Sequence, residues 1–214
     1  MIENKKTIFT MMGLPASGKG TQATMLSEKF GLSIVGVGNL VREEMKKNSD
    51  DPFVADIKKR YDAGIPQPDE VAIDLVKNYL EEHQEGVIFD NFPFREGQAK
   101  FIDQYIDEHP KFEGPVVIYI KIAPETAVKR VTSRRVCSEC GAIYAASDEM
   151  ICDKCGGSLI VRADDNEETM RKRIDFYLPR IKEMVEYYSK KNKVIIIDGE
   201  KSVSEVSKSI LEQI

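Results

Sequence analysis

The chain has 214 residues, 42% hydrophobic and 31% charged, which suits one compact domain with a real core and excludes disorder, collagen-like repeats and coiled coil as whole-chain descriptions. A formal net charge of −5 argues against a general binder of nucleic acid or anionic membranes, because such binders need a basic surface. Its apolar runs are far shorter than the roughly 20 residues of a membrane helix, and residues 1–12 carry no export signal, so we expect a soluble, cytoplasmic protein.

Five short apolar runs predict β-strands. They are rich in β-branched residues and hydrophobic at successive positions, which is typical of parallel strands buried on both faces. The predicted strands are residues 7–12, 33–37, 87–90, 116–122 and 194–198. Between them, apolar residues recur every three or four positions and predict helices over residues 23–30, 69–82, 97–108 and 168–190. This alternation predicts an α/β fold with a five-stranded parallel sheet covered by helices on both faces.

Two stretches do not fit the alternation and are predicted to be inserts. Residues 39–67 read as helical, whereas residues 136–161 hold all four cysteines and show little helical periodicity. The predicted domains are a core of residues 1–35, 68–130 and 164–214, a helical insert of residues 36–67, and a cysteine-bearing insert of residues 131–163.

A glycine-rich loop with the pattern G-x4-G-K follows the first predicted strand and leads into a helix. Gly13 and Gly18 let the backbone wrap closely around phosphates, and Lys19 can reach the outer ones. The alternative is an ordinary glycine-rich turn, but the strand, loop and helix context favours a phosphate loop. A Ser or Thr often follows the lysine, but here Gly20 does and Thr21 supplies the hydroxyl one residue later, so direct magnesium coordination by that hydroxyl is not expected.

Charged residues complement this loop. The third predicted strand ends at Asp90, and an acid at the tip of a neighbouring strand can hold Mg²⁺ or its waters. Seven of the ten arginines lie between Arg130 and Arg180, around the cysteine insert of an otherwise acidic chain. Guanidinium groups stabilise the charge of a phosphoryl group in transfer. The alternative, a solvated helix face, is our prediction for Arg171 and Arg180.

The four cysteines form two C-x2-C-G knuckles, with eleven residues between Cys140 and Cys152. Such knuckles aim both thiolates at one centre, and two knuckles complete a tetrahedral site suited to Zn²⁺. Because a closed four-thiolate shell leaves no position for a substrate, the predicted metal is structural. The alternatives are two disulfides or thiols without metal. The predicted ligands are Cys137, Cys140, Cys152 and Cys155.

The motifs resemble those of the adenylate kinases and related nucleoside monophosphate kinases, in the long form that carries a lid. The similarity spans residues 7–206, nearly the whole chain. The matching motifs are GLPASGKGTQ at 13–22, GNLVRE at 38–43, DE at 69–70, DNFPFREGQA at 90–99, RVTSRR at 130–135, DDNEETMRKR at 164–173 and DGEK at 198–201. The resemblance implies a fold of the phosphate-loop NTPase type. It also implies that the helical insert binds the monophosphate and that the cysteine insert is a zinc-binding lid over the triphosphate.

The resemblance implies reversible phosphoryl transfer from Mg·ATP to a nucleoside monophosphate, with AMP as the predicted acceptor. The implied catalytic residues are Lys19, Arg134, Arg162 and Arg173. The implied ATP-binding residues are Ala16, Ser17, Gly18, Lys19, Gly20, Thr21, Arg130, Arg134 and Lys201. Asp90 is expected to contact the magnesium through its bound waters and not as a direct ligand. The implied monophosphate-binding residues are Val37, Arg42, Ile65, Pro66, Gln67, Asn91, Phe94, Arg95, Gln98, Arg162 and Arg173. The family's default is a monomer, and the acidic composition predicts no nucleic-acid or membrane partner.

The acceptor site departs from the family pattern. Asn91 and Phe94 stand where the family has a glycine and a phosphate-binding arginine, whereas Gln98, which reads the base edge in the family, is retained. Either the chain turns differently at Asn91 and Arg95 reaches the acceptor phosphate beside Arg42, or the charge is missing and the acceptor is held weakly. Other acceptors (UMP, CMP or GMP) and a weakly active relative are therefore alternatives to AMP.

Two other classes of protein share parts of this pattern. A phosphate-loop NTPase that drives a switch would need a water-positioning residue and switch loops, and the sequence suggests neither. A zinc-ribbon adaptor on a nucleotide-binding scaffold would bind nucleic acid or protein. The ribbon between its first and last cysteine carries four acids and the single base Lys154, which argues against nucleic acid.

Overall fold

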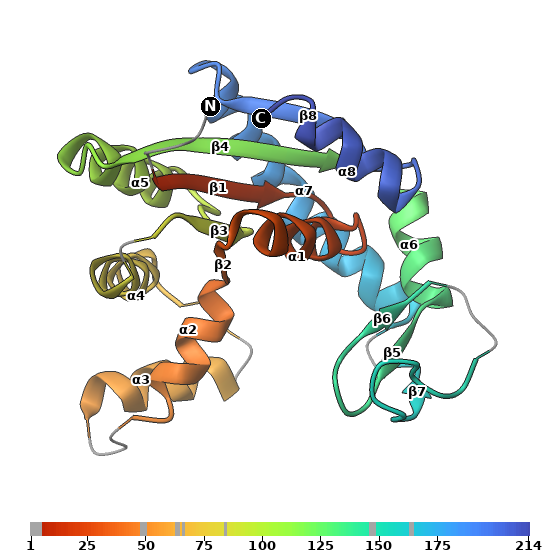
Figure 1. Cartoon of the computed structure of the whole chain (residues 1–214). Coiled ribbons are helices and arrows are strands. Elements are labelled where there is room, and N and C mark those ends of the chain that lie inside the picture. The colour runs from red at the N-terminus through yellow and green to blue at the C-terminus, as the bar shows by residue number, and fades with distance from the viewer. Residues whose placement is uncertain are drawn as a thin grey trace.

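The computed structural model describes residues 6–47, 51–62, 65, 67–83, 85–145, 149–162 and 165–214. Within these residues, five parallel strands form one sheet in the order β2-β3-β1-β4-β8 (Figure 1). The strands are β1 (Lys6–Met12), β2 (Ser33–Val35), β3 (Val87–Asp90), β4 (Phe112–Lys121) and β8 (Val194–Asp198). The predicted α/β fold with a five-stranded parallel sheet is confirmed.

Helices cover both faces of this sheet. The helices are α1 (Lys19–Phe30), α2 (Val37–Glu44), α3 (Pro52–Asp62), α4 (Asp69–Glu82), α5 (Glu96–Glu108), α6 (Pro124–Ser133), α7 (Glu167–Ser189) and α8 (Val203–Leu211). Buried residues of α1 and α8 pack with one face, and those of α4, α5 and α7 pack with the other. Each strand therefore needs apolar side chains on both sides, which explains the unbroken hydrophobic runs.

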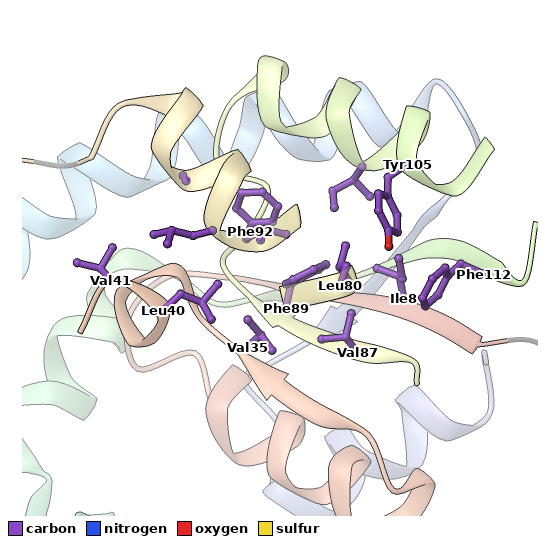
Figure 2. Packing of buried hydrophobic residues seen from close by; sticks show 14 of the residues in the cluster. Ile8, Val35, Leu40, Val41, Leu80, Val87, Phe89, Phe92, Tyr105 and Phe112 are labelled. Carbon is purple, nitrogen blue, oxygen red and sulfur yellow. The ribbon is translucent and has the colours of Figure 1, made fainter. Parts of the chain in front are cut away.

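The two faces are visible in neighbouring residues of β1. Ile8 belongs to the cluster with α4 and α5, drawn in Figure 2, whereas Phe9 belongs to the cluster with α1 and α8. Side chains alternate across a strand, so these neighbours point into different layers. Both are at most 1% exposed, and the sheet is thus the middle layer of three.

The structure corrects two predicted strand ends. Val37 is the first residue of α2 and not the end of β2, whose pairing with β3 stops at Val35. β4 begins at Phe112 instead of residue 116, because Phe112 and Glu113 pair with the start of β1. This early segment contains Gly114 and Pro115, so it carries no apolar run that would mark it as a strand.

Two segments extend away from the sheet, one at the lower left and one at the lower right of Figure 1. One contains α2 and α3, as the helical reading of the first insert predicts. The other is a separate antiparallel sheet of order β6-β5-β7, which contains the four cysteines. Its strands are β5 (Arg135–Cys137), β6 (Ile143–Tyr144) and β7 (Leu159–Ile160). The domain boundaries given above remain predictions. Among the described residues, no helix is long and apolar enough to cross a membrane.

Candidate active site

The loop between β1 and α1 is built for close approach of its own backbone. A Cβ added to Gly13 would lie 2.5 Å from Ser17 Oγ and 2.7 Å from the carbonyl oxygen of Ile120. Gly18 caps α1 in the left-handed region at φ 94°, where L side chains are strained. Any larger residue at Gly13 would therefore displace the loop, whose backbone N–H groups lie at the positive end of α1.

Four predicted site residues from different parts of the chain meet beside this loop. Lys19 begins α1, Asp90 ends β3, Arg134 follows α6 and Arg173 lies on α7. Burial lowers the pKa of Lys19, the Asp90 carboxylate opposes that change, and the positive charges of Arg173 and Arg134 lower the pKa further. Three cations and the Asp90 carboxylate thus lie close enough to influence one another beside the loop, where the cations can attract an anionic ligand.

Two buried oxygens in this region have no hydrogen-bond partner in the described part of the chain. They are Asp90 Oδ1 and Ser17 Oγ. Buried polar atoms are nearly always paired in folded proteins, so both point to a ligand or an ordered water. A carboxylate oxygen beside a phosphate loop matches the hard oxygen ligands that Mg²⁺ prefers, directly or through water. The residues present therefore fit the predicted magnesium.

Arg130 links the phosphate loop to the turn that follows β8. Its Nη2 donates to the carbonyl oxygen of Gly199 at 2.7 Å, and its Nη1 lies 3.4 and 3.5 Å from the carbonyl oxygens of Ala16 and Ser17. Arg130 is thus adjacent to the loop and bound to its backbone, and its contact with ATP remains a prediction. Lys201 is exposed two residues beyond Gly199, and Gly20 and Thr21 are exposed on the first turn of α1.

Arg134 forms a buried, bidentate ion pair with Asp165. Its Nε and Nη2 donate to the two carboxylate oxygens at 2.7 and 2.6 Å. The Asp165 side chain is fully buried, and that of Arg134 is 13% exposed. Arg134 immediately precedes β5 and Asp165 lies just before α7, so the pair links the two chain segments that enter and leave the small sheet.

The remaining predicted arginines do not all reach this cluster. Arg162 is exposed in the segment after β7, and Arg42 is exposed on α2, where it donates to Asn39 Oδ1. Arg171 forms an exposed ion pair with Glu167 one turn away, which fits the solvated helix face predicted for it. Arg180 is partly exposed on the same helix, and its guanidinium lies 3.9 Å from the ring centroid of Phe176, which is itself exposed.

A cavity of about 570 Å³ adjoins the end of β3. Its lining combines apolar walls with a few polar groups, as small-molecule sites do. Predicted acceptor residues that line it are Val37, Ile65, Gln67, Asn91, Phe94, Arg95 and Gln98. Asp90 also lines it, so this one carboxylate borders both the cavity and the phosphate loop. Pro66 lies outside the described residues.

The backbone and side chains around position 94 explain how the altered motif folds. Asn91 adopts a left-handed conformation at φ 54°, which asparagine and glycine both tolerate. The Phe94 ring packs against Phe176 and Tyr177, with ring centroids 5.9 and 5.4 Å apart. Arg95 stays at the cavity wall, where its Nη1 donates to Asp69 Oδ1 at 3.0 Å.

The four cysteines converge on one centre. Their sulfur atoms all lie within 4.8 Å of one another, and all four are free thiols, so the disulfide alternative is wrong. In a tetrahedral zinc site with Zn–S bonds of about 2.3 Å, neighbouring sulfurs lie about 3.8 Å apart, so this cluster can hold such a metal ion. Gly141 and Gly156 adopt left-handed conformations at φ 72° and 76°, which allow the tight turn after each knuckle.

The adenylate kinase family model matches residues 11–193. The chain belongs to the adenylate kinase family. Curated adenylate kinases from Thermoanaerobacter sp. (strain X514), Methanocella arvoryzae and Archaeoglobus fulgidus are 36%, 37% and 38% identical to it. These alignments cover 93–94% of this chain and 94–95% of the relatives. The chain is therefore an enzyme of the nucleoside monophosphate kinase class, as its motifs predict.

For this adenylate kinase family member, the structure adds cavity residues that sequence reasoning did not assign. Tyr61, Asp69, Phe176 and Tyr177 line the same cavity. The sequence signal for Asp69 is ambiguous. An acidic residue in the first turn of a helix is explained by its favourable interaction with the helix dipole and does not by itself indicate a binding site. The two aromatic residues of α7 carry no motif, and only the approach of α7 to the end of β3 brings them to the cavity.

Proposed function

We propose that this chain catalyses the reversible reaction ATP + AMP = 2 ADP. The observation that carries the proposal is the position of Asp90, which borders both the phosphate loop and the cavity lined by Gln98 and Arg95. Two nucleotides bound on either side of Asp90 would place their phosphates next to each other. Phosphoryl transfer then needs positioning, charge neutralisation and exclusion of water, without a covalent intermediate.

On the donor side, the loop backbone and the Lys19 ammonium bind the outer phosphates of ATP. Magnesium, when bound with ATP near Asp90, neutralises charge on the phosphate oxygens. The guanidinium of Arg134 is oriented by Asp165 through Nε and Nη2, which leaves Nη1 to bind a phosphate oxygen. Arg173 stands on the same side as a second cation. Arg162 is exposed and would join them when the lid closes over ATP.

On the acceptor side, Arg95 and Arg42 hold the phosphate of AMP. The apolar walls, among them Val37 and Ile65, cover the base, and the carboxamide of Gln98 binds its polar edge. Phe94 contributes an aromatic surface in place of the charge that the family pattern has there. The acceptor is thus held by one arginine from the wall of the cavity and one from the projecting insert.

A panel of acceptors tests this function. With Mg·ATP as the donor, AMP, GMP, CMP, UMP and dTMP are compared in a coupled assay for ADP. We expect AMP to have the highest kcat/KM. A higher value for another monophosphate would reassign the acceptor, and ATP hydrolysis that ignores every monophosphate would indicate an NTPase switch. No turnover with any of them would indicate a scaffold for the zinc ribbon.

Replacing Arg95 by alanine should lower kcat/KM for AMP at least about tenfold with little change in the KM for ATP. The reason is that a charge-assisted hydrogen bond to a phosphate contributes roughly 1.5–3 kcal/mol, equivalent to about 10- to 150-fold in affinity. Initial rates with AMP and with ATP varied separately measure the two effects. Arg171→Ala is the matched control, because Arg171 forms an exposed ion pair with Glu167 and is not among the residues that line the cavity. The proposal is contradicted if Arg95→Ala has the same kcat/KM for AMP as the wild type and Phe94→Arg raises it. That result would show that Arg95 does not replace the charge that is missing at position 94.

We further propose that the four cysteines bind one Zn²⁺ per chain and that this metal stabilises the lid. The small sheet offers few apolar contacts of its own: its buried cluster consists of Cys137, Cys152 and Leu159. A segment of this size gains much of its folding free energy from metal binding. Zinc would cross-link the two knuckles and would take no part in phosphoryl transfer.

Metal analysis of the purified protein should find about one zinc per chain. A chelator used with excess Mg²⁺ should then increase proteolytic cleavage within residues 135–162 while the core remains resistant. Absence of zinc, iron and every other thiophilic ion would contradict the site. Cys152→Ser should weaken the lid without removing chemistry, so complete loss of transfer in a variant whose lid is still folded would contradict the structural role.

A further inference from the structure

The carboxamide of Gln98 is held at both ends by the protein. Its Oε1 accepts a hydrogen bond from the backbone N–H of Phe94 at 2.7 Å, and its Nε2 donates to Asp69 Oδ1 at 2.9 Å. Only 6% of Gln98 is exposed. A rotation of the amide by 180° would place two donors together at Phe94 and two acceptors together at Asp69. Buried pairs of that kind are costly, so one orientation is enforced.

This held carboxamide lines the acceptor cavity together with Asp69. A carboxamide carries two N–H donors and two acceptor lone pairs. One donor and one lone pair are used within the protein, so one of each remains for a ligand. The remaining pair has a fixed order in space, with its donor on the Asp69 side and its acceptor on the Phe94 side.

Adenine and guanine differ in the order of donor and acceptor along the edge that such a carboxamide can contact. Adenine presents an amino donor beside a ring-nitrogen acceptor, whereas guanine presents a carbonyl acceptor beside a ring N–H donor. A bidentate contact therefore matches adenine in one amide orientation and guanine in the opposite orientation. We infer that Asp69 is a specificity-determining residue, because it locks Gln98 in the orientation that selects adenine over guanine. This inference rests on the proposed function, in which Gln98 binds the base of AMP.

Asp69 also binds Arg95 through the same oxygen, and the two effects can be separated. Arg95 is proposed to contact the phosphate, which AMP and GMP share. Any change in Arg95 therefore alters both acceptors alike and cancels in the ratio of their kcat/KM values. A change in the orientation of Gln98 alters this ratio, which a merely structural role of Asp69 would leave unchanged.

The test compares the kcat/KM ratio of AMP to GMP in the wild type and in Asp69→Asn. An asparagine can either donate to Gln98 or accept from it, so it removes the preference at this end while it preserves the size of the side chain, and only the N–H of Phe94 still favours the original orientation. We expect the ratio to fall about three- to tenfold, because the charge-assisted contact at this end is lost while the contact with Phe94 remains. The KM for ATP should stay unchanged, which also verifies that the variant is folded. Asp69→Ser serves as a second variant if Asp69→Asn folds poorly.

Two controls make the outcome specific. Glu70→Gln removes an exposed acid from the same first turn of α4 and should leave the ratio unchanged. Gln98→Ala should lower the ratio by itself, and adding Asp69→Asn to it should cause no further fall.

An Asp69→Asn ratio within about twofold of the wild type, with a lowered ratio in Gln98→Ala, overturns the role of Asp69 and leaves the proposed function standing. The role is also overturned if Asp69→Asn lowers the ratio as much in the Gln98→Ala background as it does in the wild type. If Gln98→Ala leaves the ratio unchanged, Gln98 does not bind the base, and that part of the proposed function fails as well.

Discussion

Replacing Lys19 by alanine should lower kcat by about 10²–10³ or more while the chain keeps its fold. The Lys19 ammonium is the cation of the phosphate loop, and it shares its surroundings with Asp90, Arg134 and Arg173. Charge on the outer phosphates shifts during transfer, and a cation already in place stabilises that shift without reorganisation. The fold should persist because the Lys19 side chain belongs to none of the hydrophobic clusters that the described residues form.

The kcat of Lys19→Ala is measured by the coupled ADP assay at saturating ATP and AMP, and its thermal unfolding is followed by circular dichroism. Lys29→Ala is a matched control, because Lys29 is an exposed lysine in the last turn of the same helix. The control should retain wild-type activity. A Lys19→Ala activity within about threefold of the wild type would mean that the loop is only a turn.

Replacing Asp165 by alanine should lower the free energy of unfolding by about 3–5 kcal/mol. The variant leaves the Arg134 guanidinium, which is 13% exposed, without the carboxylate that now accepts two of its hydrogen bonds. The loss should also lower kcat, because Arg134 would no longer be held in one orientation next to Lys19. Urea unfolding measures the first effect and the coupled assay measures the second.

The chain offers a matched control in the pair of Arg171 and Glu167. This ion pair has a similar short contact of 2.7 Å, but both side chains are more than half exposed. Glu167→Ala should therefore cost less than about 1 kcal/mol, even with the loss of an acid in the first turn of α7. Equal losses in Asp165→Ala and Glu167→Ala would contradict the role of burial. The double variant Arg134→Ala with Asp165→Ala should be more stable than Asp165→Ala alone, because no charge is left unpaired.

The parts of this protein that its sequence predicts are those that depend on neighbours along the chain. The phosphate loop needs Gly13, Gly18 and Lys19 at a short spacing between a strand and a helix, and the knuckles need two cysteines and a glycine in five residues. The five strands of the large sheet are predictable because burial on both faces leaves an unbroken apolar run in each. Family membership followed from these local patterns and from their order.

α6 and α8 lie outside the helices that apolar periodicity predicts, although each carries a local signal. α6 begins with Pro124, which suits the first turn of a helix, and α8 begins with a capping box formed by Ser202 and Glu205. Both helices are short, so too few turns are available for apolar periodicity to stand out. Cap signals, used alongside periodicity, would have located them.

Contacts between distant residues were decided only by the tertiary structure. The sequence places Arg134 and Asp165 31 positions apart and gives no sign that they pair. Asp69 reads as an acid that starts a helix, and its contacts with Arg95 and Gln98 arise because the start of α4 packs beside the start of α5. Local patterns determine which segments become strands, loops and knuckles, because those depend on short-range sterics and burial. Which charged side chain meets which partner depends on how the segments pack, and that is a property of the whole fold.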